Sequence, residues 1–242
     1  MSAPAARGTR RDPEDQGHVM PIRDAATIVL VRDAGGQAPR VLMGQRGAGA
    51  AFMPNKFVFP GGAVDPDDSR VALAAPVSAD EARRLRFQPV TEGAPPPEAM
   101  ICAAIRELWE EAGLMLSVPG AWQGPLPADW AAFARAGRRP SPEGLRYIFR
   151  AVTPPGRTRR FDARFFLADA DAIEADLDDF SHACEELSHL HWIELAEARR
   201  LDLPFVTEVV LAEAAAVLKG GAVESVPFFD NSGPVATFRR ID

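Results

Sequence analysis

Three glutamates lie close together in a segment of strong helix formers that runs from Glu98 to Ala112. In a helix, Glu107, Glu110 and Glu111 share an arc of about 100°, so their carboxylates can converge on one point outside it. Adjacent anions repel one another, and a hard divalent cation such as Mg²⁺ or Mn²⁺ offsets this repulsion while also accepting phosphate oxygens. The cluster therefore predicts a metal site that can act on a phosphate compound.

The simpler alternative for an acidic helix face is solubility, with Arg106 and Glu110 forming an ordinary pair one turn apart. The surrounding spacing favours the metal site. Gly61-Gly62 stands upstream, and seven residues separate Glu98 from the run RELWEEAGL. This pattern resembles the Nudix box, G-x5-E-x7-R-E-U-x-E-E-x-G-U, where U is an aliphatic residue. Every position of the helix half fits that pattern.

The loop half of the motif is interrupted. Residues 63–97 place 35 positions between Gly62 and Glu98 where the box has five, so 35 minus 5 leaves 30 extra. A Nudix subgroup that includes the peroxisomal coenzyme A diphosphatases has interrupted boxes, and the segment 52–62, which ends in FPGG, looks like theirs. The FDARFFLA run at 161–168 extends the similarity. Because the helix half carries the glutamates, the interruption is expected to affect substrate recognition more than catalysis.

The resemblance implies an α/β fold, a Nudix-type α/β/α sandwich with a mixed sheet. It also implies that Glu107, Glu110 and Glu111 bind Mg²⁺ or Mn²⁺, with the carbonyl oxygen of Gly61 as a further ligand. The implied reaction is attack of a metal-activated water on a phosphorus of a P–O–P linkage. Arg106 is expected to orient the glutamates rather than to bond the substrate.

The general base is open at this point, because family members use either a box glutamate or a downstream acid. The candidates are Glu107, Glu111, Glu185 and Glu186. For the substrate, the subgroup resemblance favours coenzyme A or acyl-coenzyme A over ADP-ribose, a nucleotide sugar or a dinucleotide. A catalytically idle domain that senses a nucleotide is a further alternative, which the presence of all three box glutamates disfavours.

Four arginines are candidate ligands of the substrate phosphates, because guanidinium groups can bond two phosphate oxygens at once. Arg46 follows the second expected strand, and Arg157, Arg159 and Arg160 precede the FDARFFLA strand. The alternative for each is a solvated loop or a surface ion pair. We expect the group at 157–160 to meet the 3′-phosphate of coenzyme A.

Short strands with interposed helices must position these residues. A hairpin is expected from Ala25–Val31 and Arg40–Gln45, which a Gly-Gly turn separates. Phe57–Phe59 leads into Pro60-Gly61-Gly62, where a sharp turn should leave backbone atoms accessible. The other expected elements are strands at 114–118, 145–152, 161–168 and 190–193, short helices at 78–86 and around Trp130, and longer helices at 98–112 and 204–219.

The chain is expected to form a flexible tail at 1–20 and a single domain at 21–242. Two stretches within it, at about 65–97 and 119–144, are interpreted as insertions. The first leaves the chain beside the glycines and returns at the glutamate helix. We therefore expect it on the substrate side of the molecule.

Charge and composition restrict the classes of partner. A formal net charge of -7 disfavours broad contact with nucleic-acid phosphates. Cys102 and Cys184 form no metal or redox motif. No apolar run is long enough for a membrane span, and the first twenty residues lack the apolar centre of a secretory signal. We expect a cytoplasmic protein that binds a small nucleotide-like diphosphate, without nucleic-acid or membrane partners, and a homodimer is one possible assembly.

Overall fold

The computed structural model describes residues 20–242, so the tail expected at 1–20 lies, except for Met20, outside the described residues. The main strands are β1 (Ile22–Arg32), β2 (Arg40–Arg46), β3 (Phe57–Val58), β4 (Gly61–Ala63), β7 (Arg146–Val152), β8 (Arg160–Asp169), β9 (Leu187–Glu194), β10 (Val226–Asp230) and β11 (Thr237–Ile241). In the described chain they form a nine-stranded sheet in the order β11-β10-β7-β8-β1-β2-β3, with β4 paired to β1 and β9 paired to β2.

The two central strands, β1 and β8, run parallel to each other. β7 pairs antiparallel with β8, and β2 forms the expected antiparallel hairpin with β1, so the sheet is mixed. Successive residues of β1 face opposite cores: Ile28 and Leu30 belong to one, and Val29 and Val31 belong to the other. This alternation is what a strand covered on both faces requires.

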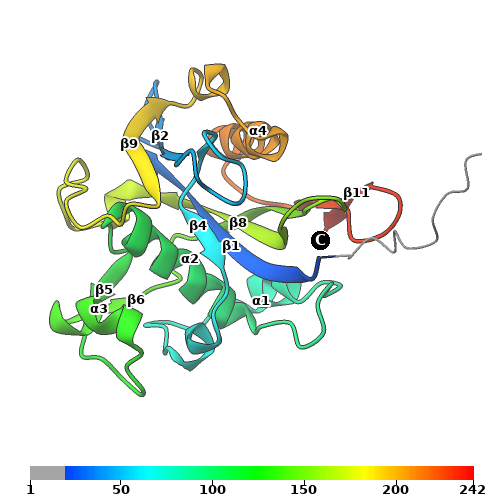
Figure 1. The fold of residues 1–242 in the computed structure, drawn as a ribbon. Coiled ribbons are helices and arrows are strands. Elements are labelled where there is room, and N and C mark those ends of the chain that lie inside the picture. The colour runs from blue at the N-terminus through cyan, green and yellow to red at the C-terminus, as the bar shows by residue number, and fades with distance from the viewer. Residues whose placement is uncertain (1–19) are drawn as a thin grey trace, which may run out of the picture.

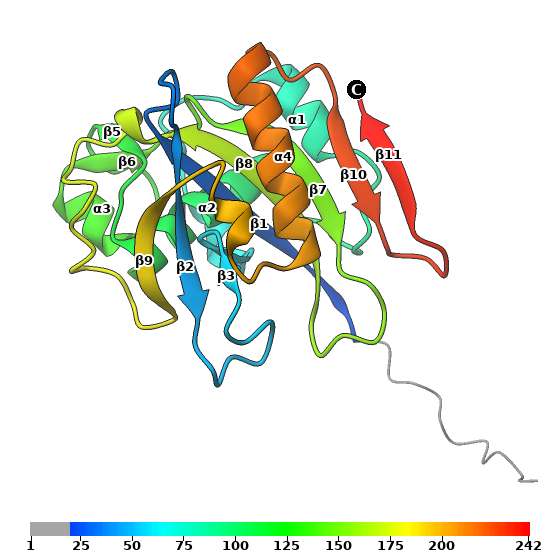
Figure 2. The same cartoon turned by 90° about the horizontal axis from the view of Figure 1, so that it is seen from above.

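Helices cover both faces of the sheet, as Figures 1 and 2 show from two directions. α2 (Pro97–Ala112) lies on one face and α4 (Phe205–Gly220) on the other. Their buried residues belong to the two separate cores: Ile101, Ile105 and Leu108 on the α2 side, and Val210, Leu211 and Ala214 on the α4 side. The expected α/β/α sandwich with a mixed sheet is confirmed.

The glutamate helix α2 begins and ends close to where the sequence predicts. Pro97 is its first residue, a position where the missing N–H costs no hydrogen bond. Gly113 ends it with a φ of 72°, a left-handed conformation that favours glycine. Across the described part of the chain, no helix is both long enough and apolar enough to pass through a membrane.

The first insertion packs on the α2 side of the sheet. It contains a short 3₁₀ helix, η1 (Pro66–Arg70), and α1 (Ala79–Leu85). Leu85 joins the core beneath α2. The Glu81 carboxylate accepts a hydrogen bond of 2.7 Å from the backbone amide of Tyr147 in β7. The insertion is therefore packed into the sandwich rather than extended into solvent.

The second insertion forms a small layer that packs against α2, because its Trp130 and Phe133 belong to the core on that side of the sheet. β5 (Ser117–Pro119) and β6 (Arg138–Pro140) pair in a two-stranded sheet, and α3 (Ala131–Arg135) lies between them in the chain. Trp130 and Phe133 are buried there, with ring centroids 5.0 Å apart. The short helix expected around Trp130 is thus present at the centre of this layer.

Four strands differ from the sequence prediction. Gly61–Ala63 is strand β4 rather than an open turn, because its backbone pairs with β1. The strand expected at 114–118 begins only at Ser117. β10 and β11 lie beyond β7 and are not predicted from the sequence at all. Of these, β4 matters most for the site, since it places the glycines against α2.

Candidate active site

Glu111 on α2 reaches the first residue of β4. Its Oε2 accepts a hydrogen bond of 2.8 Å from the amide of Gly61, and only 2% of the residue is exposed. Its other oxygen, Oε1, is buried without a hydrogen-bond partner in the described structure. Burial, and then the charge of Glu107, raise the pKa of Glu111 well above its usual value. A buried carboxylate with an unpaired oxygen is a place where a cation would be stabilised.

The two glycines of β4 lie where a side chain would not fit, Gly62 against Glu107 and Gly61 against β1. A Cβ atom on Gly62 would lie 2.3 Å from Oε1 of Glu107, and one on Gly61 would lie 2.4 Å from Oγ1 of Thr27. Neither position can therefore carry a side chain without displacing its neighbours. Burial raises the pKa of Glu107 to about 7. Glu107 and Glu111, two of the box glutamates predicted from the sequence, thus lie against the glycine backbone of β4.

Arg106 is buried and donates hydrogen bonds in two directions. Its Nη1 donates to Glu107 at 2.9 Å and to Glu110 at 3.1 Å. Its Nε and Nη2 donate to the two oxygens of Asp68, both at 3.0 Å. Burial opposes the positive charge, but these carboxylates overcome it and raise the pKa of Arg106 above its usual value. The contacts agree with the orienting role expected of this arginine.

Asp68, which belongs to the first insertion, is missing from the residues predicted from the sequence. Glu98 has the spacing from Arg106 that the box requires, so the motif can be matched without Asp68. A signal was nevertheless present, because five residues separate Asp68 from Gly62. The uninterrupted box has the same spacing between its glycine and its first carboxylate.

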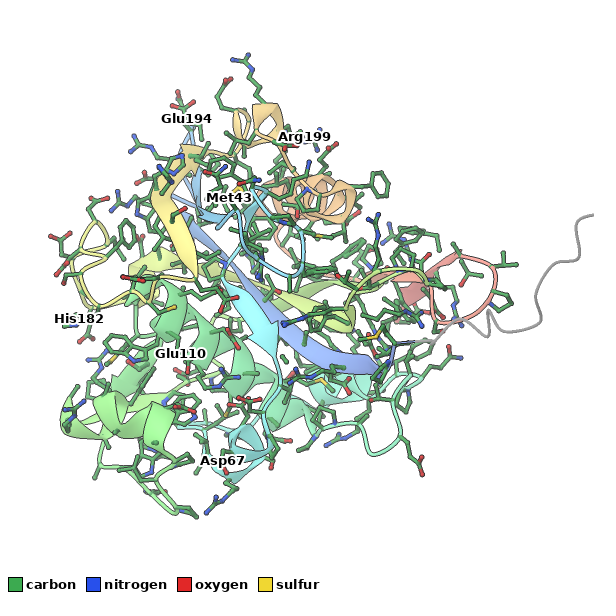
Figure 3. All side chains as sticks on the ribbon, in the orientation of Figure 1. Met43, Asp67, Glu110, His182, Glu194 and Arg199 are labelled. Atoms are coloured by element: carbon green, nitrogen blue, oxygen red, sulfur yellow. The ribbon has the colours of Figure 1, made fainter. Side chains whose placement is uncertain are left out.

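Glu110 is the most exposed of the three glutamates, with 34% of its side chain accessible against 13% for Glu107. It projects from α2 beside the sheet, as Figure 3 shows. Between residues 20 and 242, no group of three or more His, Cys, Asp and Glu side chains is gathered closely enough to hold a metal ion. The donor set still fits Mg²⁺ or Mn²⁺, because its donors are oxygens and Oε1 of Glu111 is buried and unpaired.

Arg46 and Glu186 form an ion pair of 3.0 Å near the box. The charge of Glu186 contributes to the raised pKa of both Glu107 and Glu111, after larger effects that begin with burial. The loop that carries Glu186 is held against α2, because the amide of Cys184 donates a hydrogen bond of 2.7 Å to the carbonyl of Glu110. The downstream acid predicted from the sequence is therefore brought to the site.

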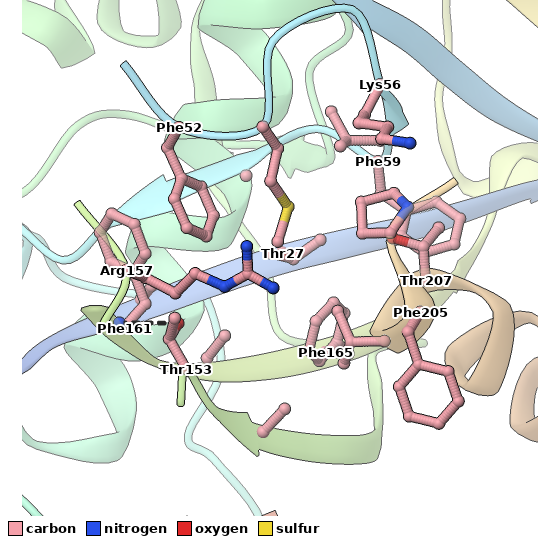
Figure 4. A pocket seen from close by; sticks show the side chains of 18 of the residues that line it. Thr27, Phe52, Lys56, Phe59, Thr153, Arg157, Phe161, Phe165, Phe205 and Thr207 are labelled. Carbon is pink, nitrogen blue, oxygen red and sulfur yellow. Dashed lines mark hydrogen bonds between the residues drawn. The ribbon is translucent and has the colours of Figure 1, made fainter. Parts of the chain in front are cut away.

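A pocket of about 470 Å³ reaches both glycines of β4. Figure 4 shows that aromatic side chains make up much of its wall. Its cationic residues are Arg46, Lys56 and Arg157, and its aromatic residues are Phe52, Phe59, Phe161, Phe165, Phe205 and Phe229. No residue of 65–97 lines this pocket, so the expectation that the first insertion borders the substrate is not met here. The insertion instead buries its apolar residues beneath α2.

The three arginines at 157–160 have different surroundings. Arg157 lines the pocket, and its guanidinium extends across the pocket in Figure 4. Arg159 is exposed and lies outside the lining. Arg160 is buried, with Nε donating to the carbonyl of Thr153 at 3.1 Å and Nη2 to the carbonyl of Asn231 at 2.9 Å. The structure therefore brings Arg157 to the pocket, but neither of its two neighbours.

Comparisons with known proteins point to one family. No family model matches the sequence. Nudix hydrolase 7 of Caenorhabditis elegans is 31% identical over 188 residues, which are 72% of this chain and 52% of the relative. The acyl-coenzyme A diphosphatase NUDT19 of Gallus gallus is 28% identical over 236 residues, covering 73% and 62% of the two chains. The chain thus spans about half to three-fifths of the length of these relatives.

A solved structure supports the same assignment. The crystal structure of a Nudix hydrolase from Alicyclobacillus acidocaldarius is 27% identical, with a TM-score of 0.56, and covers 83% of this chain and 96% of the other. The fold and the carboxylate-bearing helix define a Nudix-type domain. The chain belongs to the Nudix hydrolase family, and within it resembles an acyl-coenzyme A diphosphatase.

Proposed function

We propose that this chain is a metal-dependent hydrolase that splits the diphosphate linkage of coenzyme A or an acyl-coenzyme A. The observation that carries the proposal is the buried, unpaired Oε1 of Glu111, held beside Glu107 at the glycines of β4. Two desolvated carboxylates at one place are unfavourable without a cation. Such a pair beside a pocket with cationic residues is suited to a substrate whose phosphates the metal also contacts.

The proposed metal ligands are the carboxylates of Glu107, Glu110 and Glu111 and the carbonyl oxygen of Gly61. When bound, Mg²⁺ or Mn²⁺ would lower the pKa of water and offset charge on the phosphate oxygens. Arg106 holds two of the glutamates in place through its Nη1 hydrogen bonds. By holding the metal, the carboxylates would place the diphosphate for in-line attack.

We assign the general base to Glu186. Glu107 and Glu111 are desolvated and are required as ligands, whereas 58% of the Glu186 side chain is exposed and can exchange a proton with solvent. In this assignment Glu186 accepts the proton of the attacking water, and its partner Arg46 stabilises the negative charge that Glu186 carries before the transfer.

The pocket supports a substrate with an aromatic base and additional phosphate. Phe52 and Phe161 pack edge to face at 5.4 Å and offer apolar surface on which a base can lie. Arg157 would meet a phosphate beyond the scissile linkage, such as the 3′-phosphate of coenzyme A. The similarity to the Gallus gallus relative, an acyl-coenzyme A diphosphatase, supports the same class of substrate.

The test is a comparison of coenzyme A, an acyl-coenzyme A, ADP-ribose and a nucleotide sugar at matched concentrations with Mg²⁺ or Mn²⁺. Mass spectrometry should identify 3′,5′-ADP and 4′-phosphopantetheine from coenzyme A, with the highest kcat/KM for the coenzyme A compounds. A preference for ADP-ribose or the nucleotide sugar would reject coenzyme A as the substrate, and only the broader proposal of a pyrophosphatase would stand. Binding without cleavage of any compound would instead identify a nucleotide sensor.

A further inference from the structure

The guanidinium of Arg106 has every N–H group occupied. It carries five N–H donors, and five hydrogen bonds leave it in the structure. Nε donates once, to Asp68, and Nη2 donates to Asp68 and to the carbonyl of Ala63, each at 3.0 Å. Nη1 makes the remaining two, to Glu107 and Glu110. Because the guanidinium is planar, the groups that bind its far edge also fix the position of the edge that faces Glu107 and Glu110.

Asp68 provides most of that opposite edge. Its carboxylate bonds the guanidinium through both oxygens, the bidentate geometry that restrains a planar guanidinium most strongly. Only 1% of Asp68 is exposed. Oδ2 also accepts a hydrogen bond of 2.8 Å from the amide of Asp65 at the start of η1. The carboxylate is therefore held by its own short helix while it holds Arg106.

Glu98 does not make this contact. It lies in the first turn of α2, eight residues before Arg106, which is about 12 Å along a helix axis. Among the described residues, the ion pairs of Arg106 are with Asp65, Asp68, Glu107 and Glu110. Glu98 thus has the sequence spacing from Arg106 that the box requires, but Asp68 is the residue that contacts Arg106.

We propose that Asp68 is a positioning residue of the metal site, acting through Arg106 to fix the carboxylates of Glu107 and Glu110. This inference rests on the proposed metal-dependent function. It also explains how the box can contain 30 extra residues: they lie between Asp68 and Arg106, and the contact between these two residues is kept. Asp67, the half-buried neighbour of Asp68, marks the position of η1 below α2 in Figure 3.

The first test measures Mn²⁺ binding by electron paramagnetic resonance without substrate. Asp68→Asn should weaken Mn²⁺ binding about tenfold or more, because Arg106 is then free to compete with the metal for both glutamates. Two matched controls, Asp67→Asn on the same short helix and Glu98→Gln at the box position, should each stay within about twofold of wild type. Wild-type affinity in Asp68→Asn would overturn the proposal.

A double-variant comparison covers the case in which Asp68→Asn does not fold. Removing one partner of a buried ion pair leaves an uncompensated charge, whereas removing both is tolerated far better. Asp68→Asn combined with Arg106→Gln should bind Mn²⁺ no more weakly than Arg106→Gln alone, since Asp68 acts only through Arg106. A further loss in the double variant would contradict the proposal.

These outcomes separate the inference from the proposed function. If wild type binds Mn²⁺ but cleaves no diphosphate, the hydrolase proposal fails while the binding comparison still tests Asp68. If wild type cleaves coenzyme A and Asp68→Asn shows the same Mn²⁺ affinity and the same metal dependence of kcat, only the role of Asp68 fails. No Mn²⁺ binding by wild type would overturn both.

Discussion

Glu111 accepts a hydrogen bond from the amide of Gly61 through one carboxylate oxygen and buries the other oxygen without a partner. This contact joins the two halves of the box across 50 residues of sequence. The glycine strand and the glutamate helix are therefore one unit, although the insertion separates them in the chain. Changes at either half should affect the same property, the binding of the metal.

Gly62→Ala should impair the site without a change in any carboxylate. The added Cβ would lie 2.3 Å from Oε1 of Glu107, so that glutamate must move. We expect Mn²⁺ affinity and diphosphatase activity to fall about tenfold or more. Gly49→Ala is the matched control, because a Cβ there meets nothing within 4 Å. Equal activity of the two variants in a titration with Mn²⁺ would count against the placement of Glu107.

Arg157→Ala should lower kcat/KM for coenzyme A by about tenfold, through the loss of a charged hydrogen bond to the 3′-phosphate. The loss should be much smaller for dephospho-coenzyme A, which lacks that phosphate. Arg159→Ala, which removes an exposed arginine outside the pocket, should stay within about twofold of wild type on both substrates. Equal losses of Arg157→Ala on the two substrates would assign Arg157 a general role instead.

Glu186→Gln should reduce kcat by about 10²-fold or more, as expected on removal of a general base. The Mn²⁺ concentration for half-maximal activity should remain near that of wild type, because Glu186 is not a proposed ligand. A kcat close to that of wild type would move the general base to a box glutamate. Arg46→Ala distinguishes loss of the base from loss of its ion-pair partner, and should leave more activity than Glu186→Gln.

The stability of the protein should depend on pH through Glu81. Burial raises the pKa of Glu81 in the folded protein above the usual value near 4.5, although the Tyr147 amide opposes this shift. As the pH rises, the Glu81 carboxyl therefore ionises at a lower pH in the unfolded chain than in the folded protein. The stability that Glu81 contributes below pH 4.5 is lost as the pH passes through its folded pKa. The stability of Glu81→Gln relative to wild type should increase between about pH 4.5 and pH 7.5 in urea denaturation. An unchanged or falling difference would contradict the raised pKa.

The sequence predicts the parts of the fold whose signals are local. A nearly continuous run of apolar, strand-favouring residues marks β1, and the glutamate helix has Pro97 and Gly113 at its ends. Strand β4 escapes prediction because glycines have low strand propensity, and only pairing with β1 makes it a strand. β10 also depends on distant pairing, with β7, and contains Pro227.

The residues of the site also differ in whether their roles follow from local sequence or from tertiary packing. The proposed role of Glu107, Glu110 and Glu111 follows from their spacing, since helical geometry alone places them on one side of α2. Asp68 cannot be recognised so directly, because its contact with Arg106 depends on how the insertion packs. The different surroundings of the arginines at 157–160 depend on where β8 begins, which propensity does not determine to within a residue.

The central claim is that Glu111 is a ligand of a metal required for diphosphate hydrolysis, and Glu111→Gln tests it most directly. The measurement is turnover of coenzyme A at saturating Mn²⁺ by purified wild type and variant, with thermal unfolding of both recorded without metal. We predict a loss of kcat of about 10²-fold or more and an unfolding temperature no lower than that of wild type, because the variant removes a buried charge. Turnover near that of wild type in a folded Glu111→Gln would contradict the account.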